Sequence, residues 1–266
     1  MAVAAREAAS SARRFRKHLA VYQAGPGTAA VAVGGAVVPI KELGVKFSIS
    51  YRQVEEVLRS GGRSYFAEVA AAAAELAAME DSTVAEVLLS GGKMLKASSW
   101  DVPGSAVAEV AKAVAELYRA YVPEPYVPFV GPGRYAKPVA VEERTCVIKL
   151  TRVRSLVKDV AVVPQLPEDA ALVVSTSPAV VDLAVSVDVE ATYLGPHEAG
   201  NNLLLRETFA VRLKNPEGAV VLRYNPRFSA NGDAPYPLRS VTSLEAREGP
   251  GGFRVGEDAS SNFVGM

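Results

Sequence analysis

Alternation of apolar and polar residues divides the second half of the chain into strands. From Val181 to Tyr193 apolar residues occupy every second position, and polar residues such as Asp182 and Ser186 lie between them. This period of two predicts a long, half-buried strand. Turn residues at 195–202 follow and 203–213 returns as a second long strand, so we expect a β-hairpin. Shorter apolar runs, typical of buried strands, lie at 126–130, 160–163, 171–175 and 219–224.

Two segments of the first half have the periodicity of helices. Residues 65–89 are rich in alanine, larger apolar residues recur among them on a helical period, and Gly91-Gly92 ends the pattern. Residues 105–121 predict an amphipathic helix. Its expected buried face is Val107, Val110, Val114, Leu117, Tyr118 and Tyr121. Its expected polar face is Glu109, Lys112, Glu116 and Arg119, with Lys112 and Glu116 at ion-pair spacing.

The N-terminal residues predict a further amphipathic helix. One stripe is Ala8, Ala12, Phe15 and Leu19, and the basic residues largely off it are Arg6, Arg13, Arg14 and Lys17. We expect a surface helix that docks through Phe15 and Leu19. Extended pieces at 29–38 and 45–49 then predict a hairpin-like excursion, and the prolines between 123 and 138 are expected to break any helix there.

Composition is typical of a folded protein that can associate with itself. Lysine plus arginine equals aspartate plus glutamate, so net charge favours neither nucleic acid nor an acidic substrate, and identical subunits do not repel one another. The single cysteine, Cys146, excludes an intrachain disulfide, which fits a reducing cytoplasm. It lies among apolar residues, so we expect it to be buried and not nucleophilic. No apolar run reaches the roughly 18 residues of a membrane span. Sparse Asn, Gln and Cys are a weak thermophile signal.

Catalytic and metal-binding patterns are missing from the sequence, so we expect neither an enzyme nor a metal or cofactor site. The two histidines, His18 and His197, have no nucleophile motif to serve and are expected to be solvated. One cysteine and two distant histidines cannot form a structural zinc site. The acidic pairs at 80–81 and 142–143 are neighbours in sequence, which usually point apart, so we expect them on solvated faces.

One cluster could bind nucleic acid, namely the run Arg-Arg-Phe-Arg-Lys-His at 13–18. A handful of phosphate contacts would give weak, salt-sensitive binding. A solvated helix face is the commoner explanation of such a run, and we favour it.

The order and spacing of several short motifs resemble the encapsulin family over roughly residues 5–224. Encapsulins are nanocompartment proteins of bacteria and archaea, with the major capsid fold of tailed phages. The basic, aromatic helix at 12–19 resembles the family's N-terminal helix, and Phe47-Ser48-Ile49-Ser50 resembles the segment before its spine helix. The further motifs are Glu80-Asp81, Pro125-Tyr126, the run 171–175, Asp188, Glu207-Thr208-Phe209, Asn215-Pro216-Glu217 and Val221-Leu222-Arg223-Tyr224.

The resemblance implies an α+β fold of the phage major-capsid type. A peripheral domain at 51–104 and 178–224 would hold a long spine helix and the long hairpin, and an axial domain at 105–177 would hold a central sheet with flanking helices. An amphipathic helix at 1–24 and a shortened extended loop at 25–50 precede them. Residues 225–266, rich in Gly, Pro, Ser and charge, are expected to be an extended or disordered extension.

The resemblance also implies a function. The chain would be a shell protein that self-assembles into an icosahedral nanocompartment of about 60 or more copies. This cytoplasmic shell would enclose cargo enzymes of iron storage or oxidative-stress chemistry. The alternative is the major capsid protein of a tailed virus or provirus, which packages DNA.

Two groups of site residues follow from the resemblance. Cargo would carry a short apolar targeting peptide that docks on the inner face, at Phe15, Leu19, Leu222 and Tyr224. These four side chains are otherwise explained as ordinary core residues. The loop that lines the five-fold pore would place Glu142, Glu143 and Arg144 where they set which ions enter.

Overall fold

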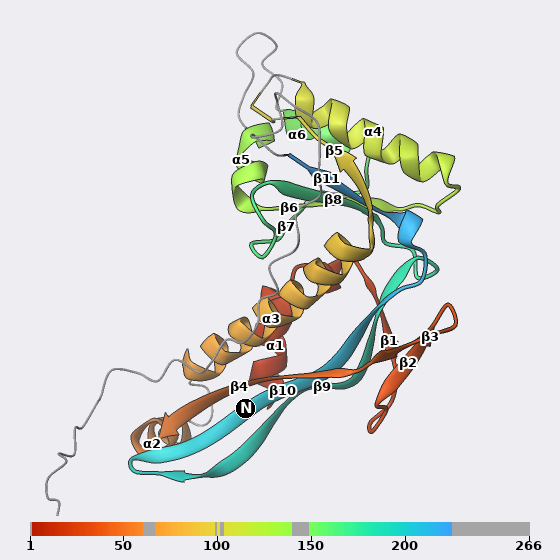
Figure 1. Ribbon diagram of the computed structural model, residues 1–266. Coiled ribbons are helices and arrows are strands. Elements are labelled where there is room, and N and C mark those ends of the chain that lie inside the picture. Colours follow the sequence, from red (N-terminus) through yellow and green to blue (C-terminus); the bar gives the residue numbers. More distant parts are fainter. Residues whose placement is uncertain (1, 61–66, 99, 102–103, 140–148, 225–266) are drawn as a thin grey trace, which may run out of the picture. The chain divides into compact units, whose positions relative to one another are not determined.

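Two β-sheets, a short hairpin and the helices packed against them make up the fold, which confirms the expected α+β class. The computed structural model describes residues 2–60, 67–98, 100–101, 104–139 and 149–224 (Figure 1). The expectations for residues 225–266, for Cys146 and for the acidic pair at 142–143 therefore lie outside the described residues.

The first sheet is dominated by the predicted long hairpin. Its strand order is β1 (Ala20–Gln23), β9 (Val181–His197), β10 (Gly200–Leu213) and β4 (Lys41–Ser50), with β1 parallel to β9 and the other pairs antiparallel (Figure 1). The expectation that β9 is half-buried along its whole length is wrong, because its first six residues are buried on both faces. Asp182 is held there by Arg212 at 2.6 Å and Lys214 at 2.7 Å, and Ser186 donates to the Gly25 carbonyl.

The second sheet gathers strands from distant parts of the chain. Its order is β5 (Lys93–Lys96), β11 (Ala219–Arg223), β8 (Ala170–Ser175), β6 (Tyr126–Val130) and β7 (Ala161–Val162). The predicted buried strands are all present within a residue or two, whereas β5 is an addition. Gly92 permits it, because a Cβ at this position would lie 2.7 Å from the Ala219 carbonyl oxygen. The hairpin-like excursion is confirmed as β2 (Ala30–Val33) paired with β3 (Ala36–Pro39), followed by β4.

Two predicted helices are confirmed and three others are additions. The alanine-rich segment forms α3 (Ala67–Gly91), and the amphipathic segment forms α4 (Ser105–Arg119). The additions are α2 (Tyr51–Arg59), α5 (Pro132–Val139) and α6 (Lys149–Arg154). The expected break at Pro132 is wrong, because proline is tolerated in the first turn, where its missing N–H has no helical partner. A 3₁₀ turn (Pro216–Gly218) precedes β11.

The N-terminal helix is shorter than expected. It ends as α1 (Ala2–Ala12), and a 3₁₀ turn (Phe15–Lys17) and β1 follow. The backbone N–H groups of Arg14 and Phe15 donate to the Asp81 carboxylate of α3, so they cannot continue the helical ladder. A continuous helix to Leu19 is therefore wrong, although Phe15 and Leu19 do dock as expected, since both are buried.

The buried face of α4 differs from the predicted face at its edges. Glu109 is buried, and Tyr118 and Tyr121 are exposed. The buried face is shifted around the helix axis relative to the predicted face. The shift arises because Ala106 and Ala113 pack in the core beside Val110, Val114 and Leu117. The expected Lys112–Glu116 pair is also replaced, since Lys112 pairs with Glu109 at 3.3 Å and Glu116 pairs with Lys93 at 3.0 Å.

The core has one large cluster, one smaller cluster and a third of three residues, Val31, Ala184 and Ala210. The large cluster contains the second sheet, α4, the end of α3, Phe15 and Leu19. The smaller one lies where α1 and α3 meet the first sheet, and its helical members are Ala5, Ala9, Val69, Ala72, Ala73 and Leu76. Alanines here let the two helices approach closely. Among the described helices, none combines the length and the apolar character that crossing a membrane requires.

Candidate assembly and cargo-facing site

The segment from Arg13 to Leu19 links the two sheets. The ring of Phe15 lies 4.6 Å from that of Phe129 on β6, and the ring of His18 lies 5.6 Å from it in an edge-to-face arrangement. Such contacts are favourable for aromatic pairs. His18 is half-buried, which corrects the expectation of a solvated side chain, and burial lowers its pKa. His197 is exposed, as expected.

Three carboxylates and two guanidinium groups hold this segment in place. Arg13 Nε lies 2.7 Å from Glu80 Oε2, and Arg13 also pairs with Glu207. Arg16 reaches Glu80 at 2.8 Å and Asp188 at 3.1 Å. We call these five side chains the buried ion-pair cluster, because Arg13, Glu80 and Glu207 are almost completely buried. The cluster joins the N-terminal segment to α3, β9 and β10.

The electrostatics of the cluster follow from its charge count. Burial, together with the nearby Glu80, raises the pKa of Glu207 to about 8, against the lowering by Arg13 and Arg16. Two cations face three acids, so one acid retains its proton most readily. Burial also raises the pKa of Asp81 to about 6, against the lowering by the backbone N–H groups of Phe15 and Arg14.

The expectation that the acidic pair Glu80-Asp81 lies on a solvated face is wrong, because both side chains are buried. The sequence nevertheless contains signals of buried carboxylates in this cluster. Glu80 lies four residues from both Leu76 and Val84, on the apolar stripe of α3. Glu207 lies two residues from both Leu205 and Phe209, on the inward face of β10. A carboxylate on an apolar face indicates a buried partner. The solvated face and the nucleic-acid surface are both wrong for Arg13 and Arg16, because their guanidinium groups are paired with carboxylates.

The expected cargo-facing residues lie in and beside the large core. Phe15, Leu19 and Leu222 are buried within this chain, and Tyr224 is half-buried, with its backbone N–H donating to the Asp169 carbonyl at 2.8 Å. Glu142, Glu143 and Arg144 lie outside the described residues. Within the described part of the chain, no group of three or more His, Cys, Asp or Glu side chains is placed to hold a metal ion.

The fold is that of phage-capsid-like shell proteins. A virus-like particle from Pyrococcus furiosus matches with a TM-score of 0.70 and 27% identity, over 83% of this chain and 97% of that one. A phage-related protein from Bordetella bronchiseptica matches with a TM-score of 0.60 and 11% identity, over 83% and 95%. At that identity the second match shows the fold alone.

The family is shown by sequence. A family model described as encapsulating protein for peroxidase, Linocin_M18, matches residues 16–210, so the chain belongs to the encapsulin family. A ferritin-like–encapsulin shell fusion protein of Pyrococcus furiosus is 30% identical over 188 residues, which cover 69% of this chain. The same alignment covers 52% of that relative, so the chain spans about half of its length.

Proposed function

We propose that this chain self-assembles into a closed icosahedral shell, and that the shell encloses cargo enzymes of iron storage or oxidative-stress chemistry in the cytoplasm. The observation that carries the proposal is the match to the virus-like particle, which extends over 97% of that chain. The family description names a peroxidase, and the fusion relative carries a ferritin-like part. Both names support an enclosed redox or iron enzyme.

Closure of a shell needs many modest contacts that act together. Large apolar side chains are exposed at separate places in the isolated chain, among them Val37 on β3, Leu58 on α2 and Tyr121 after α4. Widely separated contact points support a subunit that is held by several neighbours at once.

Microscopy tests the assembly directly. We expect hollow particles of one size in negative-stain images of the purified protein, and mass spectrometry of co-purifying proteins identifies the cargo. A sedimentation velocity profile with only monomers or small oligomers, across salt and pH, would contradict the proposal.

For the cargo-facing residues we propose two roles. Phe15, Leu19 and Leu222 are buried, so they shape the wall, whereas the half-buried Tyr224 is available to contact an apolar targeting peptide. Tyr224→Ala is expected to reduce the amount of co-purified cargo severalfold while particles still form. Tyr193→Ala, which removes an exposed ring from β9, serves as the control. Equal loading in both variants would show that Tyr224 has no part in docking.

We also propose that Glu142, Glu143 and Arg144 line the five-fold pore of the shell. Their charges would select the ions that enter the shell. Exchanging Glu142 and Glu143 for Gln is expected to change the rate at which cations reach an enclosed cargo, and Glu198→Gln on the exposed hairpin end is the control. An unchanged entry rate would remove these residues from the pore.

The viral alternative has less support. The matched phage-related protein shows the fold alone, and the pairing of Arg13 and Arg16 with carboxylates removes two of the cations that could bind phosphates. Nuclease-protected DNA in purified particles would favour the alternative, and protein cargo without DNA would exclude it.

A further inference from the structure

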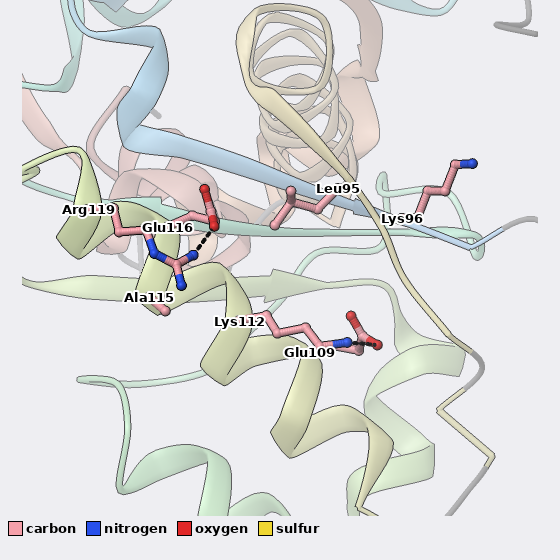
Figure 2. A pocket seen from close by; sticks show the side chains of 7 residues that line it. All are labelled: Leu95, Lys96, Glu109, Lys112, Ala115, Glu116 and Arg119. Carbon is pink, nitrogen blue, oxygen red and sulfur yellow. Dashed lines mark hydrogen bonds and ion pairs between the residues drawn. The ribbon is translucent and has the colours of Figure 1, made fainter.

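Strand β5 is the edge of the second sheet, and a groove separates it from α4. The groove has a volume of about 220 Å³ and is lined by Leu95, Lys96, Glu109, Lys112, Ala115, Glu116 and Arg119 (Figure 2). Leu95 and Ala115 supply its apolar surface, and the charged residues of α4 surround them. Ala115 leaves room where its neighbours on the helix carry long side chains.

The outer edge of β5 presents backbone groups at every second residue. β5 pairs with β11 in parallel, and the Ala97 N–H donates to the Arg223 carbonyl at 2.9 Å. Because backbone groups alternate along a strand, Met94 and Lys96 direct theirs away from β11. The strand order places no further strand beyond β5 among the described residues. An unpaired edge is a template for an added strand.

Glu109 marks one end of this edge. Its Oε1 accepts from Ser98 Oγ at 2.9 Å and from Lys112 Nζ at 3.3 Å. Its Oε2 is buried and has no hydrogen-bond partner among the residues that the structure describes. The side chain is only 5% exposed, so this oxygen has lost water without gaining a donor from the described part of the chain. A buried carboxylate oxygen without a donor destabilises the free protein, and a ligand that supplies the donor removes this cost.

We propose that the β5 edge and its groove bind an extended peptide segment of a partner protein, which adds as a strand to β5 and places a basic side chain against Glu109. Main-chain hydrogen bonds to Met94 and Lys96 hold the segment. Arg119 does not compete for Glu109, because it pairs with Glu116, and Lys112 contacts the other carboxylate oxygen, Oε1. The exposed Met94 provides an apolar contact on the other face of the added strand.

Peptide binding tests the proposal. The probe is a capped seven-residue peptide of alternating Thr and Val with a central Arg, added before and after particle assembly so that either face of a shell is reached. Hydrogen exchange at Met94 and Lys96 is expected to slow about tenfold or more, whereas the inward-facing Leu95 amide changes little. Unchanged exchange at Met94 and Lys96 under saturating peptide would overturn the proposal. Protection of both amides before peptide is added would also overturn it, because another copy would then cover the edge.

Two further variations separate strand addition from general charge attraction. N-methylation of the peptide amides that face β5 is expected to abolish binding, and N-methylation of the alternate set is not. Replacing the central Arg by norleucine, or Glu109 by Gln, is expected to weaken binding about tenfold. Glu86→Gln, on the exposed face of α3, is the control. Equal affinity for both methylated sets, or for the Glu109→Gln variant and the unaltered protein, would contradict the proposal.

Discussion

At the residue scale, the buried ion-pair cluster combines charges that are individually unfavourable away from water. Arg13 contacts Glu80 and Glu207, and Arg16 contacts Glu80 and Asp188. Removing one member leaves a charge without compensation, which is more damaging than the net value of an intact pair. The cluster therefore fixes the path of residues 13–19, and with it the position of Phe15 and Leu19 in the core.

The raised pKa of Glu207 predicts a pH dependence of stability. Its pKa is about 8 in the folded protein, against 4.5 in the unfolded chain. Between these values the folded state binds more protons, so stability falls as pH rises through this window. Glu207→Gln is expected to flatten the dependence of the unfolding temperature on pH between about pH 5.5 and 7.5. Equal slopes for the variant and the unaltered protein would show that Glu207 ionises normally.

Arg13 and Arg14 form a matched pair for a second prediction. Arg13 is buried against two carboxylates, whereas the Arg14 side chain is exposed. Arg13→Met is expected to lower the free energy of unfolding by about 3–5 kcal/mol. Arg14→Met should change it by about 0.5 kcal/mol or less. Denaturant titration of both variants measures the difference, and similar losses would contradict the assignment of the charge cluster.

At the element scale, sequence periodicity predicted the elements that local pattern determines. The β9–β10 hairpin and helices α3 and α4 follow from periods of two and 3.6, because each presents an apolar face to the core. The end of α1 could not be predicted this way, since Asp81 is 66 residues from the N–H of Phe15. Likewise β5 is too short and too basic to resemble a strand, and its place depends on β11.

The junction of α3 and β5 supports a prediction on adjacent glycines. A Cβ at Gly92 would lie 2.7 Å from the Ala219 carbonyl oxygen and 2.8 Å from that of Leu88, and backbone atoms cannot easily yield. A Cβ at Gly91 meets only the end of the Leu213 side chain. Gly92→Ala is expected to cost about 1–3 kcal/mol of stability, and Gly91→Ala clearly less. Thermal unfolding of the two variants compares them, and the reverse order would refute the proposed packing.

At the scale of the whole molecule, Tyr121 has a backbone conformation and an exposure that the fold of the isolated chain does not explain. Tyr121 follows α4 with φ of 53°, in the left-handed region, and the residue is 95% exposed. The N–H groups of Tyr121 and Val122 donate to the carbonyls of Tyr118 and Leu117, each at 3.0 Å, which is the Schellman pattern of helix ends. Glycine usually occupies this position, because a side chain there costs about 1 kcal/mol or more.

An exposed tyrosine at a strained position therefore needs a reason outside the isolated chain, and contact between subunits provides one. Tyr121→Gly is expected to stabilise the isolated subunit by roughly 1 kcal/mol, because it relieves the left-handed strain. The same change should raise the protein concentration at which particles form, since aromatic rings dominate many interfaces. Tyr121→Phe keeps both ring and strain, so it should leave both quantities nearly unchanged. Light scattering against concentration measures assembly, and denaturant titration measures subunit stability. If Tyr121→Gly assembled as readily as Tyr121→Phe, the ring would lie outside every subunit contact, and the strain at this position would remain without a benefit to the shell.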